Sequence, residues 1–463
     1  MKTQHTILVA ALGMLMFSAC HKAELAVISQ PVTQVSNGIK SDTLSGTIKG
    51  TMLAGKTYYF KSDITVNDGD SLVMQAGTKL IALGDGKTYQ TSPQIFMHGT
   101  FISLGTQTNP NYITVSNADA LRAEANQQNY TDVFQGWWGG IVCTPGPATA
   151  SNPNPAGGDA IIKWTHIELA GGPAGPDSDP AVYAEGDPRW AIYFANITKN
   201  FILEDSWVFG TKDDAIRSDG GKISFMRNSF EMCGQAGGEF VNLKSGTLGD
   251  VAYNMFVGSA TNSLKISNAG TTTTQCNVTV YNNTIINGGF RQTKSGRGGS
   301  IDFEKGARGN CYNNLIADSR FGLRITTDAD VQNVIYNNQY YYGSSPAIVG
   351  QFLSADGVAK FQAGDIYAAN AKDNNPQFYG YNLDQFDFVN NPGPITANSQ
   401  PAYLVLLGNS NFRLQQTSGA LNKGKTDFQP MGSVTATGTY GTTITPPGKD
   451  IGAYQNDGTG NQH

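Results

Sequence analysis

The chain of 463 residues has a formal net charge of −5; 14% of its residues are charged, 39% are hydrophobic and 55 are glycine. This composition excludes a disordered chain, which would be less apolar, and a mainly helical one, which would contain less glycine. The negative charge leaves no broad basic surface for nucleic acid, so we expect no nucleic-acid partner.

The first 19 residues are predicted to be a secretory signal. An apolar run from Thr6 to Phe17 follows one early lysine and is too short for a stable membrane span. The residues before Cys20 resemble a bacterial lipobox, with Phe17 in place of the usual leucine. The resemblance implies that residues 1–19 are removed and that Cys20 is acylated and anchors the chain to a lipid bilayer. A plain signal peptide followed by a chance cysteine is the alternative.

Residues 20–45 carry few strand signals and are predicted to be a polar tether. From residue 46 onward, short alternating runs such as TYYFKSDITV and IFMHGTFISL are separated by glycine turns and indicate strands with one buried face. Only the run ADALRAEANQQ near Ala118 has the composition of a helix. Two stretches rich in proline, glycine and aspartate follow, CTPGPATASNPNPAGG and GGPAGPDSDPAVYAEGDPRW. Strand-like runs resume after each stretch, so we interpret them as loops of one domain.

An asparagine that precedes an apolar residue by two positions recurs at intervals of 23 to 31 residues. Repeats of this length built from short strands indicate a solenoid. Their uneven spacing favours a right-handed parallel β-helix, because one turn of a coil can lengthen without disturbing the stacked strands. Asparagine tolerates a left-handed corner, and its amide can hydrogen-bond to the same position in the next coil. The predicted corner ladder consists of Asp205, Asn228, Asn254, Asn283, Asn314 and Asn338.

We therefore predict an all-β fold, a single right-handed parallel β-helix over residues 46–343. The end of a β-helix exposes a strand edge and core side chains, which invites association unless it is covered. Residues 344–463 are predicted to supply the last irregular coils and a C-terminal cap.

Three runs carry a resemblance to a known family. They are the run from Thr57 to Leu83, WGGIV at Trp138, and the closing motifs NPQF, NFRLQQTSGALNKG and DIGAYQ. These resemble the pectin lyase-like right-handed parallel β-helix proteins, particularly exported lipoproteins of Bacteroidota. The resemblance implies an outer-membrane lipoprotein that faces the periplasm or the cell surface. It does not determine the activity, because this scaffold hosts lyases, hydrolases, adhesins and spacers.

Asp213 and Asp214 are the first candidate catalytic residues. In the polygalacturonase branch, which TKDDAIRSDGG resembles, two aspartates act as acid and as water activator. The Asn-Thr-Asp, Gly-His-Gly and Arg-Ile-Lys elements of that branch are missing here. We therefore prefer the alternative, in which the pair consists of solvated corner residues.

Strand alternation predicts a second candidate site. The runs AIRS, VNLK, LKIS, IDFE and LRIT place polar residues in an outward stripe of Arg217, Asn242, Lys265, Asp302 and Arg324, beside Lys244, Ser267, Glu304 and Thr326. By resemblance to lyases of this fold, Lys265 or Arg324 would be the base that removes a proton next to a uronate carboxylate. Asp302 and Glu304 are the only acidic pair on the stripe that could hold Ca²⁺, which is the one cofactor that the sequence suggests. A mixed polar surface that keeps the sheet soluble is the alternative and the preferred interpretation.

All five tryptophans lie within residues 137–207, next to the aspartate-rich loops. Aromatic faces stack on sugar rings while carboxylates and amides bind hydroxyl groups, so this cluster could form a carbohydrate platform. Core filling is the alternative. The candidate binding residues are Trp137, Trp138, Trp164, Tyr183, Trp190 and Trp207, with Asp177, Asp179, Asp187, Arg217 and Asn242.

Cys143, Cys233, Cys276 and Cys311 lie in or beside apolar runs without metal-ligand spacing, so we expect buried free thiols. Two classes of function remain. The preferred one is a non-catalytic lipoprotein that binds carbohydrate or a surface partner such as an outer-membrane protein. The alternative is a lyase or glycoside hydrolase acting on acidic polysaccharide. A groove with convergent carboxylates and a base would favour the enzyme, and a flat aromatic patch the binding protein.

Overall fold

The computed structural model describes residues 38–126, 132–179, 182–235, 237–292, 297–385 and 411–463, and residues 38–463 form one compact unit. The predicted signal, Cys20 and most of the predicted tether lie outside the described residues. Gly38 already forms a bridge with Thr51, and β1 (Thr43–Thr47) pairs with β3 (Thr57–Val66), so strand pairing begins within the segment predicted to be a tether. In the described part of the chain, no helix has both the length and the apolar character needed to cross a bilayer.

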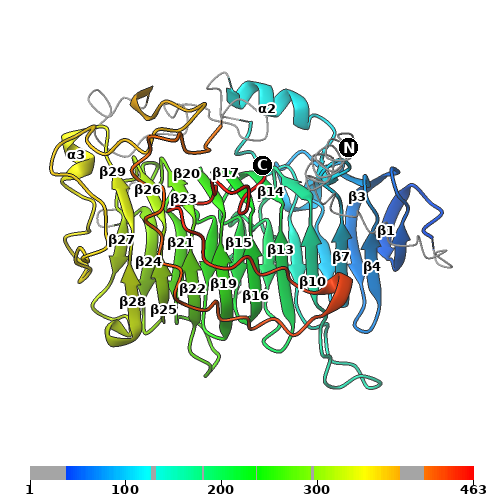
Figure 1. Ribbon diagram of the computed structural model, residues 1–463. Helices are drawn as coiled ribbons and strands as arrows, with labels where there is room; N and C mark the ends of the chain where they lie inside the picture. The colour runs from blue at the N-terminus through cyan, green and yellow to red at the C-terminus, as the bar shows by residue number, and fades with distance from the viewer. Residues whose placement is uncertain (1–37, 127–131, 180–181, 236, 293–296, 386–410) are drawn as a thin grey trace, which may run out of the picture. The chain divides into compact units, whose positions relative to one another are not determined.

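The unit is a right-handed parallel β-helix, so the predicted fold class is confirmed (Figure 1). From β4 onward each strand pairs in parallel with the strand three further along the chain, so a coil contains three strands. The long strand β3 pairs with both β5 and β6 and joins two of the three resulting faces.

Face A consists of β2 (Gly50–Met52), β4 (Ser71–Met74), β7 (Thr100–Leu104), β10 (Ala160–Lys163), β13 (Asn200–Glu204), β16 (Gly221–Met226), β19 (Thr247–Ala252), β22 (Asn277–Tyr281), β25 (Arg308–Tyr312) and β28 (Val334–Asn337). Face B consists of β5 (Lys79–Ala82), β8 (Asn111–Val115), β11 (Thr165–Glu168), β14 (Trp207–Thr211), β17 (Ser229–Cys233), β20 (Met255–Ser259), β23 (Thr284–Ile286), β26 (Leu315–Ala317) and β29 (Tyr340–Tyr342). Face C consists of β6 (Ile95–Met97), β9 (Ile141–Cys143), β12 (Ile192–Phe194), β15 (Ile216–Ser218), β18 (Val241–Leu243), β21 (Asn262–Ser267), β24 (Gly299–Glu304) and β27 (Leu323–Ile325). The helices among the described residues are α2 (Ala118–Asn126), which the sequence predicted, α3 (Pro346–Val349) and single 3₁₀ turns at Tyr89–Thr91, Val331–Asn333, Leu383–Gln385 and Gly438–Tyr440.

The core lies inside the coils, where the inward positions of each face stack on their equivalents in the next coil. On face C, buried aliphatic side chains follow one another in register. These residues are Ile141, Ile192, Ile216, Val241, Leu264, Ile301 and Leu323. All four cysteines in this part of the chain are buried free thiols, as expected.

The corner between face A and face B contains a continuous run of hydrogen-bonded asparagines. In each step the side-chain oxygen of one asparagine accepts from the backbone N–H of the asparagine one coil earlier, at 2.9 to 3.1 Å, from Asn228 through Asn254 and Asn283 to Asn314. Ser206 and Gln339 occupy the two ends of this run.

The residue before each ladder position has a left-handed backbone, and Asp205 (φ 50°) and Asn338 (φ 55°) belong to this second row. The predicted ladder is therefore wrong by one position at these two residues. The idea that the ladder asparagines themselves have a left-handed backbone is also wrong. A corner needs two residues: one turns the chain, and the next points inward to bind the neighbouring coil.

The predicted cap, residues 344–463, is described in two parts, 344–385 and 411–463, which follow different courses. The first part does follow the last coil, where Val358 donates to the Ile325 carbonyl and Ile366 bridges to Tyr340. Residues 411–463, which we call the strap, instead return along the side of the coils and cross face A (Figure 1). The backbone N–H groups of Met431 and Gly432 donate to Asp250 of β19, both at 2.8 Å.

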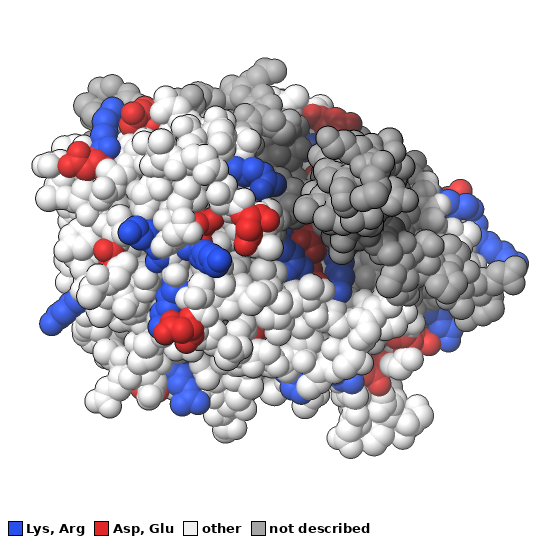
Figure 2. All heavy atoms as spheres, viewed as in Figure 1, with Lys and Arg blue, Asp and Glu red and all other residues white. Residues whose placement is uncertain are grey.

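The left-handed asparagines hold the strap. The Asn313 side chain donates to the Lys425 carbonyl at 2.8 Å and accepts from the Lys425 N–H at 2.7 Å. Asn282 binds the carbonyl of Asp450 and the N–H of Gly448 in the same way. In the view that includes face A and the strap, Figure 2 shows mostly uncharged atoms, with basic and acidic side chains interspersed. This side therefore offers no large patch of one charge.

Candidate functional site

The predicted outward stripe lies in register on face C. Arg217 pairs with Asn242, Asn242 with Lys265, Lys265 with Asp302, and Asp302 with Arg324. The row continues in the other direction to Tyr193, Val142 and Phe96. Because neighbouring strands are about 4.8 Å apart, the side chains of this row form one line across the strands.

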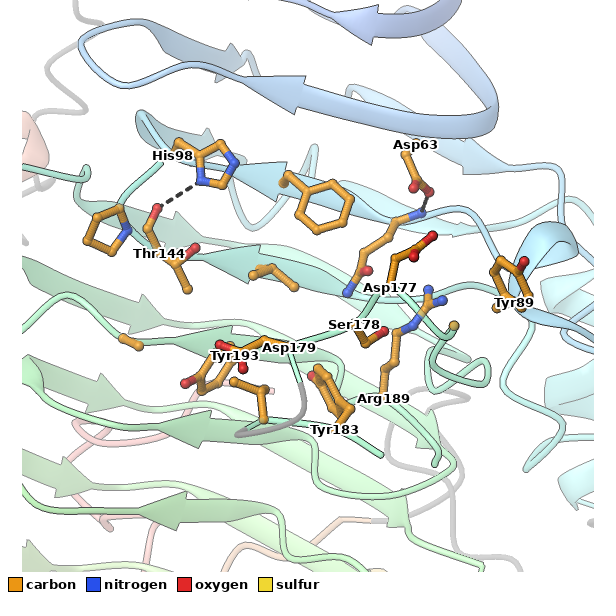
Figure 3. Close-up of a pocket in the computed structure, with 17 residues that line it drawn as sticks. Asp63, Tyr89, His98, Thr144, Asp177, Ser178, Asp179, Tyr183, Arg189 and Tyr193 are labelled. Carbon is orange, nitrogen blue, oxygen red and sulfur yellow. Dashed lines mark hydrogen bonds between the residues drawn. The ribbon is translucent and has the colours of Figure 1, made fainter. Parts of the chain in front are cut away.

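A pocket of about 580 Å³ opens at the Tyr193 end of this row (Figure 3). Strands β3, β6, β9 and β12 form its floor, and residues 175–179 and 182–189 form its wall. Its aromatic lining consists of Tyr89, Phe96, His98, Tyr183 and Tyr193, and its polar lining includes Asp63, Gln94, Thr144, Asp177, Ser178, Asp179 and Arg189. Figure 3 shows Asp63, Tyr89 and Arg189 toward one end of the pocket and His98 with Thr144 toward the other.

Arg189 is the most informative side chain of the pocket. It is only 5% exposed, and its Nη1 donates to the Ser92 carbonyl at 3.0 Å. Its buried Nε has no hydrogen-bond partner, and no carboxylate of the described residues lies within ion-pair distance. Burial lowers the pKa of Arg189, and Asp63 offsets only part of this shift. A buried cation without an anionic partner is costly, so the geometry suits a ligand that brings an oxygen acceptor or an anionic group.

The other end of the pocket contains a histidine with one defined hydrogen bond. Nδ1 of His98 lies 3.1 Å from the Thr144 carbonyl, which can only accept, so Nδ1 carries a proton and donates it to this carbonyl. The hydroxyl of Tyr193 donates to Asp219, which also accepts from Arg217. The pocket wall is thereby joined to the charged row.

The tryptophans do not form the predicted flat platform. Trp138 is fully buried in the core, where its Nε1 donates to the Glu168 carbonyl, and Trp137 packs partly against that core. Trp164 and Trp207 contact His463 of the strap, with ring centroids 5.5 and 3.8 Å away. The platform prediction is wrong because the rings are separated: Trp138 lies in the core and Trp190 beside the pocket, while Trp164 and Trp207 lie 5.9 Å from each other next to His463. Proximity in sequence does not reveal this separation.

Trp190 supports the pocket from behind. It is buried, and its ring centroid lies 4.4 Å from that of Tyr183. The Arg217 guanidinium carbon lies over the Trp190 ring, 4.3 Å from the centroid. Of the predicted carboxylates, Asp177 and Asp179 line the pocket. Asp187 does not, because it accepts from the Ala184 N–H within the loop.

The paired aspartates lie on the next coil and have different surroundings. Asp214 is buried and accepts from the Glu239 N–H at 2.8 Å and from the Asn242 side chain at 2.7 Å. Asp213 is half-buried; burial, together with Asp214, raises its pKa to about 8. Burial and hydrogen bonding with Asp214 also raise the pKa of Glu239 well above its usual value. The interpretation as solvated corner residues is therefore wrong for Asp214.

Both predicted bases are tied up in ion pairs. Lys265 lies 3.4 Å from Glu304 and 3.8 Å from Glu239, and these carboxylates outweigh burial and raise its pKa. The Arg324 guanidinium contacts Asp356 at 2.6 Å and Asp302 at 3.0 Å, which also raises its pKa. A base must release its proton near neutral pH, so neither residue is suited to that role.

The same ion pairs occupy the two predicted calcium ligands. Asp302 binds Arg324, and Glu304 binds Lys265 and accepts from Ser267 at 3.0 Å. Together with Glu239 these side chains line a small hollow of about 100 Å³ on the row. Among the described residues, no three histidine, cysteine, aspartate or glutamate side chains are grouped to hold a metal ion.

Sequence reasoning missed Lys244 as a candidate functional residue. This residue follows β18, two positions beyond Asn242, and is 7% exposed. Burial, with the neighbouring cations Arg217 and Lys265, lowers its pKa to about 8. The predicted stripe already placed Lys244 one coil from Arg217 and one coil from Lys265. The lowered pKa could not be predicted, because it depends on contacts between neighbouring strands. Comparison with protein-family models and with curated proteins gives no match for this chain.

Proposed function

We propose that the protein binds carbohydrate in the pocket between β3, β6, β9, β12 and residues 175–179 and 182–189. The observation that carries the proposal is the lining of this one pocket, where several aromatic rings face polar groups and a buried arginine. Its volume falls within the range of small-molecule sites, roughly 300–1,000 Å³. Rings of this kind stack on sugars, and carboxylates bind their hydroxyl groups.

Arg189 adds selectivity to this proposal. A sugar with an acidic group would supply the anion that the guanidinium lacks, and a planar guanidinium binds a carboxylate through two parallel hydrogen bonds. Asp63, Asp177 and Asp179 would repel long, highly charged chains. The pocket is therefore suited to a glycan with single acidic groups among neutral sugars.

The proposed setting is the surface of an exported lipoprotein held to the outer membrane through Cys20. This part of the proposal depends on the resemblance of residues 1–20 to a lipobox. In that setting the β-helix carries the pocket, and an outer-membrane protein is a further candidate partner.

Calorimetry and affinity electrophoresis with neutral and acidic oligosaccharides test the pocket. We expect binding that Tyr89→Ala weakens about tenfold, because Tyr89 is 38% exposed and its ring is available for stacking. Tyr440→Ala is the matched control, since Tyr440 is 46% exposed but lies on the strap. Arg189→Met should weaken acidic sugars more than neutral ones. Equal binding by the parent chain, Tyr89→Ala and Arg189→Met would refute the proposal.

A polysaccharide lyase or hydrolase is the second candidate function. The shifted pKa values of Asp213, Glu239 and Lys244 favour it, because they place a protonated carboxyl and a neutral amine within reach of physiological pH. Incubation with acidic polysaccharides, followed by ultraviolet detection of unsaturated products and a reducing-end assay, distinguishes the two classes. Product that Lys244→Gln or Asp213→Asn abolishes would establish catalysis.

A further inference from the structure

The end of the pocket that contains Arg189 also contains two exposed carboxylates and an exposed aromatic ring. Figure 3 shows Asp63, Asp177 and Tyr89 at this end, together with Arg189. Arg189 is only 5% exposed, whereas the other three side chains are exposed to solvent. This end therefore has its positive charge at the floor and its negative charges at the rim.

Neither of the two rim carboxylates is matched by a basic side chain. Asp63 accepts from the Gln94 backbone N–H at 2.8 Å, which is a neutral donor. Among the described residues, no lysine, arginine or histidine lies within ion-pair distance of Asp63 or Asp177. A ligand whose only charge is negative must pass these carboxylates to reach Arg189, and like charges oppose that approach. A positive group on the ligand, placed at the rim, would remove the opposition.

The side chains at this end are held in place by close packing. Nη1 of Arg189 donates to the Ser92 carbonyl at 3.0 Å, and a Cβ atom at Gly139 would lie only 2.1 Å from Nη1. The guanidinium thus fills space that glycine leaves open, and it stays at the floor instead of pairing with the rim carboxylates. The Tyr89 ring packs in the same way on Gly175, where a Cβ atom would lie 2.7 Å from the ring.

We propose that the acidic sugar bound at this end also carries a free amino group, so that its carboxylate binds Arg189 and its ammonium group binds Asp63 and Asp177. This selectivity depends on the proposed carbohydrate pocket and specifies which acidic sugar the pocket takes. A protonated amine can donate to both carboxylates, and the exposed face of Tyr89 offers a further contact for a cation. Acetylation of the amine removes its charge, so the pocket should distinguish the free sugar from its N-acetyl form.

Four related sugars separate the two charges. Muramic acid carries both charges, N-acetylmuramic acid only the carboxylate, glucosamine only the amine, and N-acetylglucosamine neither. Calorimetry on the full chain is run at about pH 6, where an amine with a pKa of roughly 8 is protonated, and with EDTA so that no metal ion replaces the amine. We expect muramic acid to bind about tenfold more tightly than N-acetylmuramic acid, because each exposed ion pair at the rim contributes about threefold.

Carboxylate variants test the rim directly. Asp63→Asn and Asp177→Asn should each weaken muramic acid about threefold and leave N-acetylmuramic acid unchanged. Asp187→Asn is the matched control, because Asp187 is also exposed and accepts from a backbone N–H but does not line the pocket; it should bind both sugars as the parent chain does. Arg189→Met should weaken both acids but not glucosamine. Circular dichroism verifies that each variant is folded.

Equal binding of muramic acid and N-acetylmuramic acid by the parent chain would overturn the proposed selectivity, and so would failure of all four sugars to bind. A preference for muramic acid that is unchanged in folded Asp63→Asn and Asp177→Asn would also overturn it. These results leave carbohydrate binding itself standing, because the comparison of the parent chain with Tyr89→Ala on longer oligosaccharides decides that question separately.

Discussion

Replacing Asn254 by alanine should destabilise the β-helix by several kcal/mol, because this side chain links three coils. Its oxygen accepts from the Asn228 backbone N–H and side chain, and its amide donates to the Phe225 carbonyl and to Asn283, all between 2.9 and 3.0 Å. In the alanine variant the Asn228 N–H loses its side-chain acceptor inside the corner. A buried donor left without a partner costs about 1–3 kcal/mol, and each of the other three hydrogen bonds contributes about 1 kcal/mol. The sum is about 4–6 kcal/mol.

Urea unfolding followed by tryptophan fluorescence and circular dichroism measures this loss as a lower midpoint. Asn370→Ala is the matched control, because Asn370 is exposed and makes a single hydrogen bond to Asp373; its effect should stay within about 0.5 kcal/mol. Asn254→Asp retains the acceptor but sets a second carboxylate oxygen against the Phe225 carbonyl and the Asn283 oxygen in a buried corner, so its loss of stability should be at least as large as that of Asn254→Ala. A loss below 1 kcal/mol in Asn254→Ala would show that the ladder is not a main source of stability.

Three further predictions concern other parts of the chain. Burial raises the pKa of Asp318 to about 7 in the folded chain, whereas an unfolded aspartate has a pKa of ~3.9. The protonated side chain therefore contributes its full stabilisation of the fold below pH ~4, and this stabilisation is lost as the pH rises to about 7. The free energy of unfolding of the parent chain, measured by urea titration, should fall relative to Asp318→Asn over that window by at most about 4 kcal/mol; parallel pH profiles would contradict this. Asn313→Ala should make the strap, residues 411–463, sensitive to limited proteolysis while the coils stay intact, because it removes both bonds to Lys425; Asn333→Ala, which affects only an exposed contact with Asp330, is the control. Cys20→Ala should abolish incorporation of a labelled fatty acid and transfer the protein from the membrane to the soluble fraction; continued membrane association would argue against the lipoprotein prediction.

The fold could be predicted because its periodic signals are local. An asparagine directly precedes the four successive face B strands β17, β20, β23 and β26. Strand alternation was enough to place Arg217, Asn242 and Lys265 in one row. The ends of the ladder were misplaced because a corner contains two residues with separate roles. At Asp205 and Asn338 the residue that follows is not an asparagine, so the alignment settled one position too early.

The candidate site was harder to predict from the sequence, because its contacts and charges depend on residues of different coils. Arg189 reaches the Ser92 carbonyl across 97 positions of sequence, and no local pattern announces that contact. Trp138 and Trp190 are the same residue type and lie close together in the sequence, yet Trp138 fills the core and Trp190 packs against Tyr183 of the pocket wall. The protonation state of Lys244 depends on charged residues of the flanking strands. The sequence shows which strands carry these residues but not which ion pairs they form.

The strap also constrains the order in which the protein can reach its final state. Lys163 binds the Gly441 carbonyl 278 positions away, and Arg227 binds the Thr443 carbonyl 216 positions away. Contacts that close such long loops form after the local winding of the coils. During synthesis, Asp250 and the other polar groups beneath residues 411–463 must remain hydrated until the last part of the chain arrives. The wound but unstrapped chain is therefore a distinct species, and a quality-control protease that cleaves loose termini would act on it selectively.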